Sequence, residues 1–381
     1  MDKRVKFASY FAMFTFGMAN GSLGPLLIPI ADFFKLEVAQ VGYPVVFSSM
    51  GFFTAGIFTS FVWNIRRASF ILFFFSLSLS AASFCIFFLH TSIKIILIFL
   101  FLIGLSGGML HCGTNSLFAE IFVKKRAGYL SLLLVFFGLG AFLGPLVVGA
   151  ILTFSVGWYI FYFFLGTVAL SLSFFFKKDI KPEVVRINEH FSRHRPALSL
   201  FFWVIALVNF LAMGVQSSYH SWIPFFLTRA RDISPAVASY SVSLFWISMM
   251  GGRALFARFS HKVDLYISLI FATGCSALFF TLSFLTAEIL LIVLSLIFSG
   301  MLFSFVSPGL RALGGNIFSG HIGFVIGILT GIGSVGSTFL PWFVGWLSQE
   351  IGITWGVLVI PFFSGLISVV LFKMRSSQKI G

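Results

Sequence analysis

The chain has 381 residues, of which 59% are hydrophobic and 9% are charged, and its mean hydropathy is +1.05. A soluble domain carries about 25% charged residues because its surface must face water, so this composition excludes a soluble globular enzyme and a disordered chain. The net charge of +14 does not by itself indicate a nucleic-acid partner, because the placement of the cations matters more than their sum.

Long apolar runs follow one another along the chain. A helix needs about 20 apolar residues to cross a bilayer whose hydrocarbon core is about 30 Å thick. The runs are continuous and do not alternate with the period of two of a membrane strand, so we expect helices. The twelve predicted spans are 7–33, 41–63, 68–90, 93–122, 127–154, 156–176, 198–227, 234–257, 265–286, 289–315, 320–348 and 352–373.

Lys and Arg are unevenly distributed among the loops between these spans. With the amino terminus in the cytoplasm, 21 of the 25 basic residues fall on cytoplasmic segments and 4 fall outside. Cytoplasmic loops of membrane proteins carry such an excess, so we expect both termini in the cytoplasm of a bacterial cell, with the chain in the inner membrane. The basic residues would then meet anionic membrane lipids, and no nucleic-acid partner is expected.

One polar stretch, KKDIKPEVVRINEHFSRHRPA at 177–197, interrupts the apolar runs. It predicts a cytoplasmic linker between an amino-terminal six-helix bundle, 1–176, and a carboxy-terminal six-helix bundle, 198–381. The three cysteines lie in apolar runs without the spacing of metal ligands, so we expect no metal site and no cofactor.

Three motifs recur in the two predicted bundles at nearly the same offset. Glycine, proline and glycine recur with the same spacing in the fifth and eleventh spans, offset by 196 residues. Internal repeats of this kind, with a polar site near the midplane, are typical of secondary transporters. The matching segments are GAFLGPLVVG at 140–149 with GSTFLPWFVG at 336–345, SGGML at 106–110 with FSGML at 298–302, and GMANGS at 17–22 with AMGVQS at 212–217.

Along essentially its whole length the chain resembles the major facilitator superfamily. The resemblance implies twelve transmembrane helices in two pseudo-symmetric six-helix bundles, alternating access and a monomer. SFVWNIRRAS at 60–69 keeps the basic pair of the family's loop 2–3 signature but lacks its Asp. The segments that resemble the fucose/glucose/galactose-type sugar transporter branch are GMLHCGTNSLFAEIF at 108–122, LLLVFFGLGAFLGPL at 132–146, GVQSSYHSWIPFFL at 214–227 and FWISMMGGRALFARF at 245–259.

Acidic residues are absent from the middle of every apolar run, and Asp32 and Glu120 lie near the ends of theirs. Proton coupling needs a buried group that titrates, so His111 is the predicted coupling residue and His220, nearer the outer end, is the second candidate. Without mid-span charges to pair with ions, we expect a small neutral solute, with a sugar as the first choice. It would move by facilitated diffusion or together with a proton or sodium ion.

Polar side chains within apolar runs need a cavity or a polar partner. For the amides, hydrogen bonding between helices explains them as well as substrate contact does, and for the aromatic rings packing is the stronger alternative. Ser307 is assigned as the repeat partner of Asn115. The predicted substrate contacts are Asn20, His111, Asn115, Gln216, Tyr219, Trp222, Trp246 and Ser307.

Charged residues near span ends are candidate gates. We expect Glu120 to pair with Arg311 or Arg253 when the cytoplasmic side is closed, and the alternative is a local pair with Lys124. Asp32 with Arg229 or Arg231 is the corresponding candidate on the outer side.

Glycine and proline should thin and bend the fifth and eleventh spans, with plain helix packing as the alternative. The predicted hinge residues are Gly140, Gly144, Pro145, Gly336 and Pro341.

Four functions remain to be weighed. The first is a carrier for a neutral sugar or polyol. The second is a drug or metabolite efflux antiporter, because the fifth span also resembles the antiporter signature of drug exporters. A polytopic membrane enzyme is disfavoured, since the sequence shows no paired mid-span carboxylates, metal-ligand spacing or nucleotide-binding loop. A non-transporting sensor on a carrier scaffold is the fourth.

Overall fold

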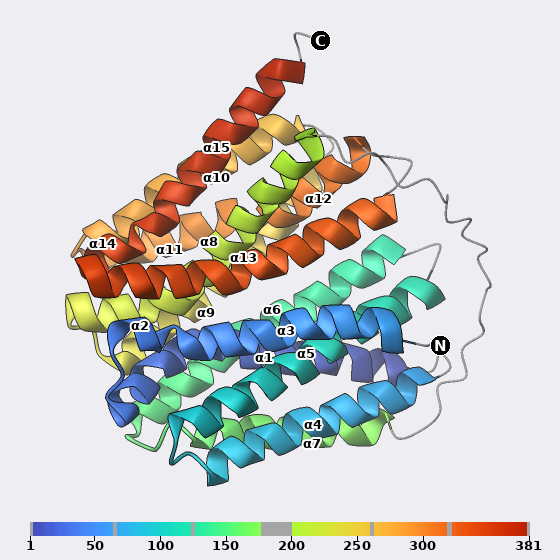
Figure 1. Cartoon of the computed structure of the whole chain (residues 1–381), viewed down its shortest axis with the longest axis vertical. Helices are drawn as coiled ribbons and strands as arrows, with labels where there is room; N and C mark the ends of the chain where they lie inside the picture. The colour runs from blue at the N-terminus through green and yellow to red at the C-terminus, as the bar shows by residue number, and fades with distance from the viewer. Residues whose placement is uncertain are drawn as a thin grey trace. The chain divides into compact units, whose positions relative to one another are not determined.

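Fifteen helices form in the residues that the computed structural model describes, which are 3–63, 67–122, 126–176, 200–259, 263–317 and 322–378 (Figure 1). The first seven helices are α1 (Lys3–Phe34), α2 (Val38–Val41), α3 (Tyr43–Val62), α4 (Ala68–Phe88), α5 (Ile93–Ile121), α6 (Arg126–Thr153) and α7 (Ile160–Phe176). The other eight are α8 (Leu200–Arg231), α9 (Pro235–Phe259), α10 (Leu265–Leu285), α11 (Ile289–Phe303), α12 (Val306–Ile317), α13 (Ile322–Ile351), α14 (Ile353–Val357) and α15 (Val359–Gln378). The predicted linker at 177–197 lies outside the described residues.

The helices correspond to the predicted spans. Ten helical stretches of the described chain are long and apolar enough to cross a membrane. Of the other two, α7 is apolar but has 17 residues, and α9 has 25 residues but is less apolar, with serines and glycines along its length. Three spans each correspond to two consecutive helices, namely α2 with α3, α11 with α12 and α14 with α15. The prediction of an all-α membrane protein with twelve transmembrane helices is confirmed.

The chain divides into two compact units. The first contains Met1–Leu36, Tyr43–Asn188 and Ser234–Ser243, and the second contains Glu37–Gly42, Glu189–Ile233 and Leu244–Gly381. Within the first, α1 packs on α6, α3 on α5 and α4 on α7. Within the second, α8 packs on α13 and α10 on α15, while glycines of α9 and α11 bring these two helices together. The same pairs of spans therefore pack in each unit, as an internal repeat requires.

Two short segments, Glu37–Gly42 and Ser234–Ser243, belong to a different unit from the residues next to them in the sequence. In the second unit, the Ala39 amide of α2 donates a hydrogen bond to Oε1 of Gln349 in α13 at 2.9 Å. In the first unit, Ser243 Oγ, in the first part of α9, donates to the carbonyl oxygen of Phe142 in α6 at 2.8 Å. These hydrogen bonds explain why α2 and the start of α9 belong to the units in which they lie.

The tenth span is broken at Ser304 and Phe305, which separate α11 from α12. Pro308 accounts for the break, because proline has no N–H and its ring opposes the carbonyl four residues earlier. That carbonyl, of Ser304, instead accepts a hydrogen bond from Nε of Arg253 at 3.0 Å. The predicted apolar span over 289–315 is confirmed as one stretch that can cross a membrane, and within it the helix is interrupted at this point.

Pro341 has a similar effect inside α13, although this helix remains continuous. The carbonyl of Ser337 loses its helical donor because Pro341 lacks an N–H. Oγ of Ser217 in α8 donates to this carbonyl oxygen at 3.0 Å. A side chain of the neighbouring helix thus satisfies the group that proline leaves free.

Candidate functional site

Two glycine contacts establish which positions of the two halves are equivalent. A Cβ on Gly140 in α6 would collide with the carbonyl oxygen of Phe14 in α1. A Cβ on Gly336 in α13 would collide with the carbonyl oxygen of Phe210 in α8. Both glycines permit a close backbone approach that any side chain would prevent. Because both members of each pair differ by 196 in number, position n of α1 corresponds to position n + 196 of α8.

This equivalence relates two of the predicted substrate contacts, Asn20 in α1 and Gln216 in α8. Both are half-buried amides, and their numbers differ by 196. Within the described ranges, neither side chain has a hydrogen-bond partner. Amides at equivalent positions with unused donors and acceptors can bind the hydroxyl groups of a solute.

The fourth and tenth spans have the same relationship. A Cβ on Gly104 would collide with backbone of α3, and a Cβ on Gly300 would lie 2.8 Å from a backbone oxygen of α9. Their numbers again differ by 196, so His111 corresponds to Ser307 and Asn115 corresponds to Arg311. The sequence prediction paired Ser307 with Asn115 by an offset of 192, and this pairing stays a prediction.

The equivalent pairs also form equivalent hydrogen bonds. Nδ2 of Asn115 donates to the carbonyl oxygen of His111 at 2.7 Å. Nη2 of Arg311 donates to Oγ of Ser307 at 2.8 Å. In each half, the side chain of the later residue therefore donates a hydrogen bond to the residue one turn earlier. The acceptor is the backbone carbonyl of His111 in the first unit and the hydroxyl of Ser307 in the second.

The His111 ring lies among phenylalanines of three helices. Its centroid is 5.8 Å from that of Phe16, 5.7 Å from that of Phe52 and 6.2 Å from that of Phe137. The imidazole is half-buried, so the first unit provides a largely apolar setting for the predicted coupling residue.

Asn209 of α8 is a polar residue that the sequence argument missed. Its Nδ2 donates to the carbonyl oxygen of Leu329 in α13 at 2.7 Å, and its Oδ1 accepts from Oγ of Ser307 at 3.4 Å. The side chain is fully buried. It interrupts the apolar sequence VIALVNFLAM, so the rule that selected Asn20 would also have selected Asn209.

Tyr219 and Trp222 are used in packing within the second unit. Both side chains have no exposed surface. The Tyr219 hydroxyl donates to Oγ of Ser283 at 3.0 Å, and Nε1 of Trp222 donates to the carbonyl oxygen of Pro341 at 2.9 Å. Their polar atoms are already bonded inside the protein, so the proposal below does not rest on them. Trp246 is likewise buried, and its ring lies beside that of His220.

The candidate gating residues occupy distinct settings. Glu120 is exposed, and its Oε1 accepts a hydrogen bond from Nε1 of Trp63 at 2.8 Å within the first unit. Arg253 and Arg311 belong to the second unit, where both are half-buried. Arg253 bonds the carbonyl of Ser304 at the helix break, and Arg311 bonds Ser307 in α12. Pairing of Glu120 with either arginine stays a prediction, and the alternative partner Lys124 lies outside the described residues.

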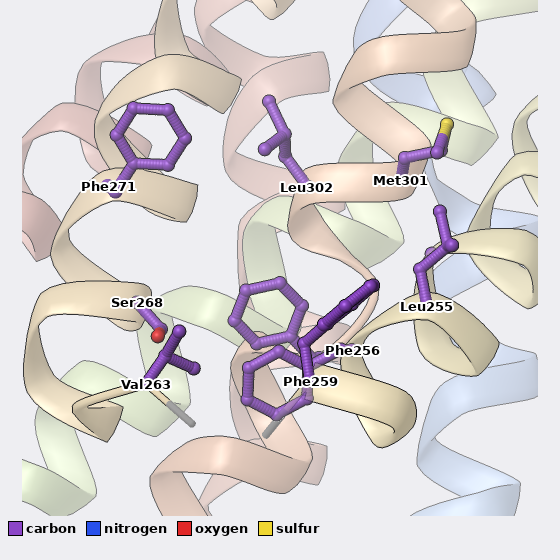
Figure 2. A pocket seen from close by; sticks show the side chains of 10 residues that line it. Leu255, Phe256, Phe259, Val263, Ser268, Phe271, Met301 and Leu302 are labelled. Atoms are coloured by element: carbon purple, nitrogen blue, oxygen red, sulfur yellow. The ribbon is translucent and has the colours of Figure 1, made fainter. Parts of the chain in front are cut away.

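An apolar groove of about 300 Å³ lies on α9, α10 and α11 of the second unit (Figure 2). Leu255, Phe259, Phe271 and Met301 are among the side chains that line it (Figure 2). Ser268 is the one lining residue with a polar side chain, and its Oγ donates to the carbonyl oxygen of Asp264 at 2.8 Å. The groove suits hydrocarbon and offers little to a polar solute.

Comparison with known families decides the class. The model of the Major Facilitator Superfamily matches residues 9–318. The chain belongs to this superfamily. It is therefore a multi-pass integral membrane transporter and not an enzyme, and the predicted major facilitator fold is confirmed.

Two known proteins of similar sequence align with most of this chain. A "Protein TsgA homolog" of Buchnera aphidicola subsp. Schizaphis graminum is 25% identical over 72% of this chain and 70% of its own length. The glucose/mannose transporter GlcP of Bacillus subtilis is 22% identical over 90% of this chain and 87% of its own length.

Two solved structures share the fold. The nucleoside transporter NupG has a TM-score of 0.76 at 12% identity and covers 98% of this chain and 100% of its own. A D-xylose–proton symporter has a TM-score of 0.75 at 14% identity and covers 97% of each chain.

Proposed function

We propose that this transporter carries a small neutral polar solute, a sugar or a similar polyol, across the bacterial inner membrane by alternating access. The observation that carries the proposal is the pair of equivalent amides, Asn20 and Gln216. Both are half-buried inside membrane spans and lack a partner within the described ranges. Such groups are costly in hydrocarbon unless they face a cavity or a ligand.

A neutral solute fits the charges of the described residues better than an ion does. Four arginines of the second unit are half-buried among the described residues, and each already has an acceptor. The acceptors are the carbonyl of Phe284 for Arg231, the carbonyl of Ser304 for Arg253, the hydroxyl of Ser307 for Arg311 and the carboxylate of Asp264 for Arg375. Arg253 also lies at the carboxyl end of α11, where the helix dipole favours a positive charge. The arginines therefore have structural partners and do not require an anionic solute.

The similar proteins support the same class of substrate. One is named a glucose/mannose transporter and another a D-xylose–proton symporter. Sugars present hydroxyl groups that both donate and accept hydrogen bonds. A side-chain amide complements them, because its carbonyl oxygen accepts hydrogen bonds and its NH₂ group donates them.

Uptake by proteoliposomes tests the proposal. Wild-type protein should accumulate or equilibrate radiolabelled D-glucose, D-mannose or D-xylose. Asn20→Leu and Gln216→Leu should each reduce uptake at low substrate concentration about tenfold, because each removes about 1.4 kcal/mol of hydrogen bonding to the solute. Gln40→Leu is the matched control, since the Gln40 amide bonds the backbone of Glu37, and it should keep wild-type uptake.

Two outcomes would contradict the proposal. Wild-type vesicles that take up none of these sugars would exclude the substrate class. Export of a drug or metabolite, seen as resistance in cells that express the protein, would favour the efflux antiporter.

A further inference from the structure

His220 is a buried polar residue that the proposed function has not used. It lies on α8 with 6% of its surface exposed. Nδ1 of its ring is fully covered and has no hydrogen-bond partner among the described residues. A buried polar atom without a partner costs free energy, and such atoms are uncommon in folded proteins.

The position of His220 on its helix relates it to Gln216. Residues four apart lie on the same face of a helix, one turn from each other. Asn209 lies seven residues before Gln216 on this face, and its side chain is satisfied by Leu329 and Ser307. Asn209, Gln216 and His220 thus lie along one face of α8. The amide of Asn209 is satisfied, the amide of Gln216 is half-buried, and the imidazole of His220 has an unsatisfied nitrogen.

An aromatic ring lies next to this imidazole. The His220 and Trp246 ring centroids are 5.4 Å apart, with an angle of 47° between the rings. Trp246 comes from α9 and is 2% exposed. The indole therefore packs against the imidazole and helps to cover it within the second unit.

We infer that His220 binds the transported polyol, with its Nδ1 forming a hydrogen bond to a hydroxyl group next to the one bound by Gln216. A neutral imidazole has one donor and one acceptor nitrogen, and a hydroxyl can satisfy Nδ1 in either tautomer. The bound solute thus supplies the hydrogen bond that the protein itself does not. This inference rests on the proposed function, because it assigns a contact to the same substrate.

Substitution at His220 gives opposite expectations for a binding residue and for a packing residue. His220→Leu removes the unsatisfied atom, so the melting temperature of the ligand-free protein should stay the same or rise. Its affinity for D-glucose, D-mannose or D-xylose, measured by thermal shift on the full-length purified protein, should fall about tenfold. A merely structural histidine would lower the melting temperature instead.

Substitution of His220 by Asn and by Gln distinguishes the two ring nitrogens, because the two amides extend to different distances from the backbone. His220→Asn places an amide near the position of Nδ1 and should keep affinity within about threefold of wild type, whereas His220→Gln extends past it and should bind as weakly as His220→Leu. His90→Gln is the control, because Nδ1 of His90 already lies 2.7 Å from the carbonyl oxygen of Phe87, and it should bind like wild type.

The outcomes distinguish this inference from the function on which it rests. If none of the three sugars stabilises the wild type, the proposed function fails and the assignment of His220 fails with it. If a sugar stabilises wild type and His220→Leu equally, the proposed function stands and His220 is not a substrate contact. Equal weakening by Asn, Gln and Leu would exclude Nδ1 as the contact atom.

Discussion

Single glycines decide how closely the long helices of each unit can approach. Gly336 touches backbone of α8, whereas Gly331, five residues earlier in α13, has nothing within 4 Å of its would-be Cβ. The same residue type in the same helix therefore has two different roles. The sequence shows where the glycines of α13 lie, but it does not show which neighbouring helix each glycine contacts.

We expect Gly336→Ala to destabilise the protein by about 1–3 kcal/mol, because the new methyl group would force apart two packed backbones. Gly331→Ala is the matched control and should be neutral or stabilising by up to about 1 kcal/mol, the difference in helix propensity. Thermal unfolding in detergent measures both. A loss of stability in Gly331→Ala equal to that in Gly336→Ala would show that backbone contact is not the cause.

At the residue scale, sequence reasoning selects positions by the chemistry of the side chain alone. Asn20 and Gln216 stand out because amides are rare in apolar spans. Tyr219 and Trp222 looked equally suitable, but their polar atoms bond to Ser283 and Pro341, which a sequence cannot reveal. The choice between a ligand contact and a packing contact depends on the partner helix.

At the scale of elements, prolines change the long helices in two ways. Pro308 breaks the tenth span, while Pro341 leaves α13 continuous. In both cases a side chain of another helix bonds the carbonyl that proline leaves free, Arg253 in one and Ser217 in the other. The predicted hinge at Pro341 stays a prediction, but its cost in hydrogen bonding is already offset.

A double-mutant cycle tests this compensation. Ser217→Ala should destabilise the protein by about 1 kcal/mol, because the carbonyl of Ser337 then has no donor. In a Pro341→Ala background the restored N–H can satisfy that carbonyl, so Ser217→Ala should cost close to nothing there. Denaturation of all four proteins gives the coupling energy, and strictly additive effects would disprove the link.

The twelve spans were predictable because hydropathy reports directly on the surroundings of each helix. The break between α11 and α12 was not predicted, although Pro308 signals it. A proline in a membrane span can bend, break or leave a helix intact, depending on what satisfies the freed carbonyl. That information lies in Arg253, about 50 residues away in sequence.

At the scale of the whole molecule, the repeat is the strongest link between sequence and function. An offset of 196 relates packing glycines, amides and local hydrogen bonds in the two units. It also shows where the halves differ, since His111 in one corresponds to Ser307 in the other. A titratable group that one half has at a position where the other half has none is a natural place for ion coupling.

His111→Gln tests whether that difference couples transport to protons. If His111 carries the coupled proton, wild-type uptake should change with pH in the range from about 5 to 8, where histidine titrates. The glutamine variant should lose this dependence while still exchanging substrate across the vesicle membrane. Uptake measured across this pH range, with and without a proton gradient, gives the answer. A variant that keeps the wild-type profile would exclude His111 from coupling.

The hydrogen bonds between α8 and α13 have a consequence for any conformational change. Asn209, Ser217 and Trp222 each donate to a backbone carbonyl of α13, at Leu329, Ser337 and Pro341. Three hydrogen bonds at different positions along the two helices thus join α8 to α13. We expect the two helices to move together as one rigid body. A spectroscopic label on either helix would therefore report the displacement of both. The distance between a label on α8 and a label on α13 should stay constant during transport.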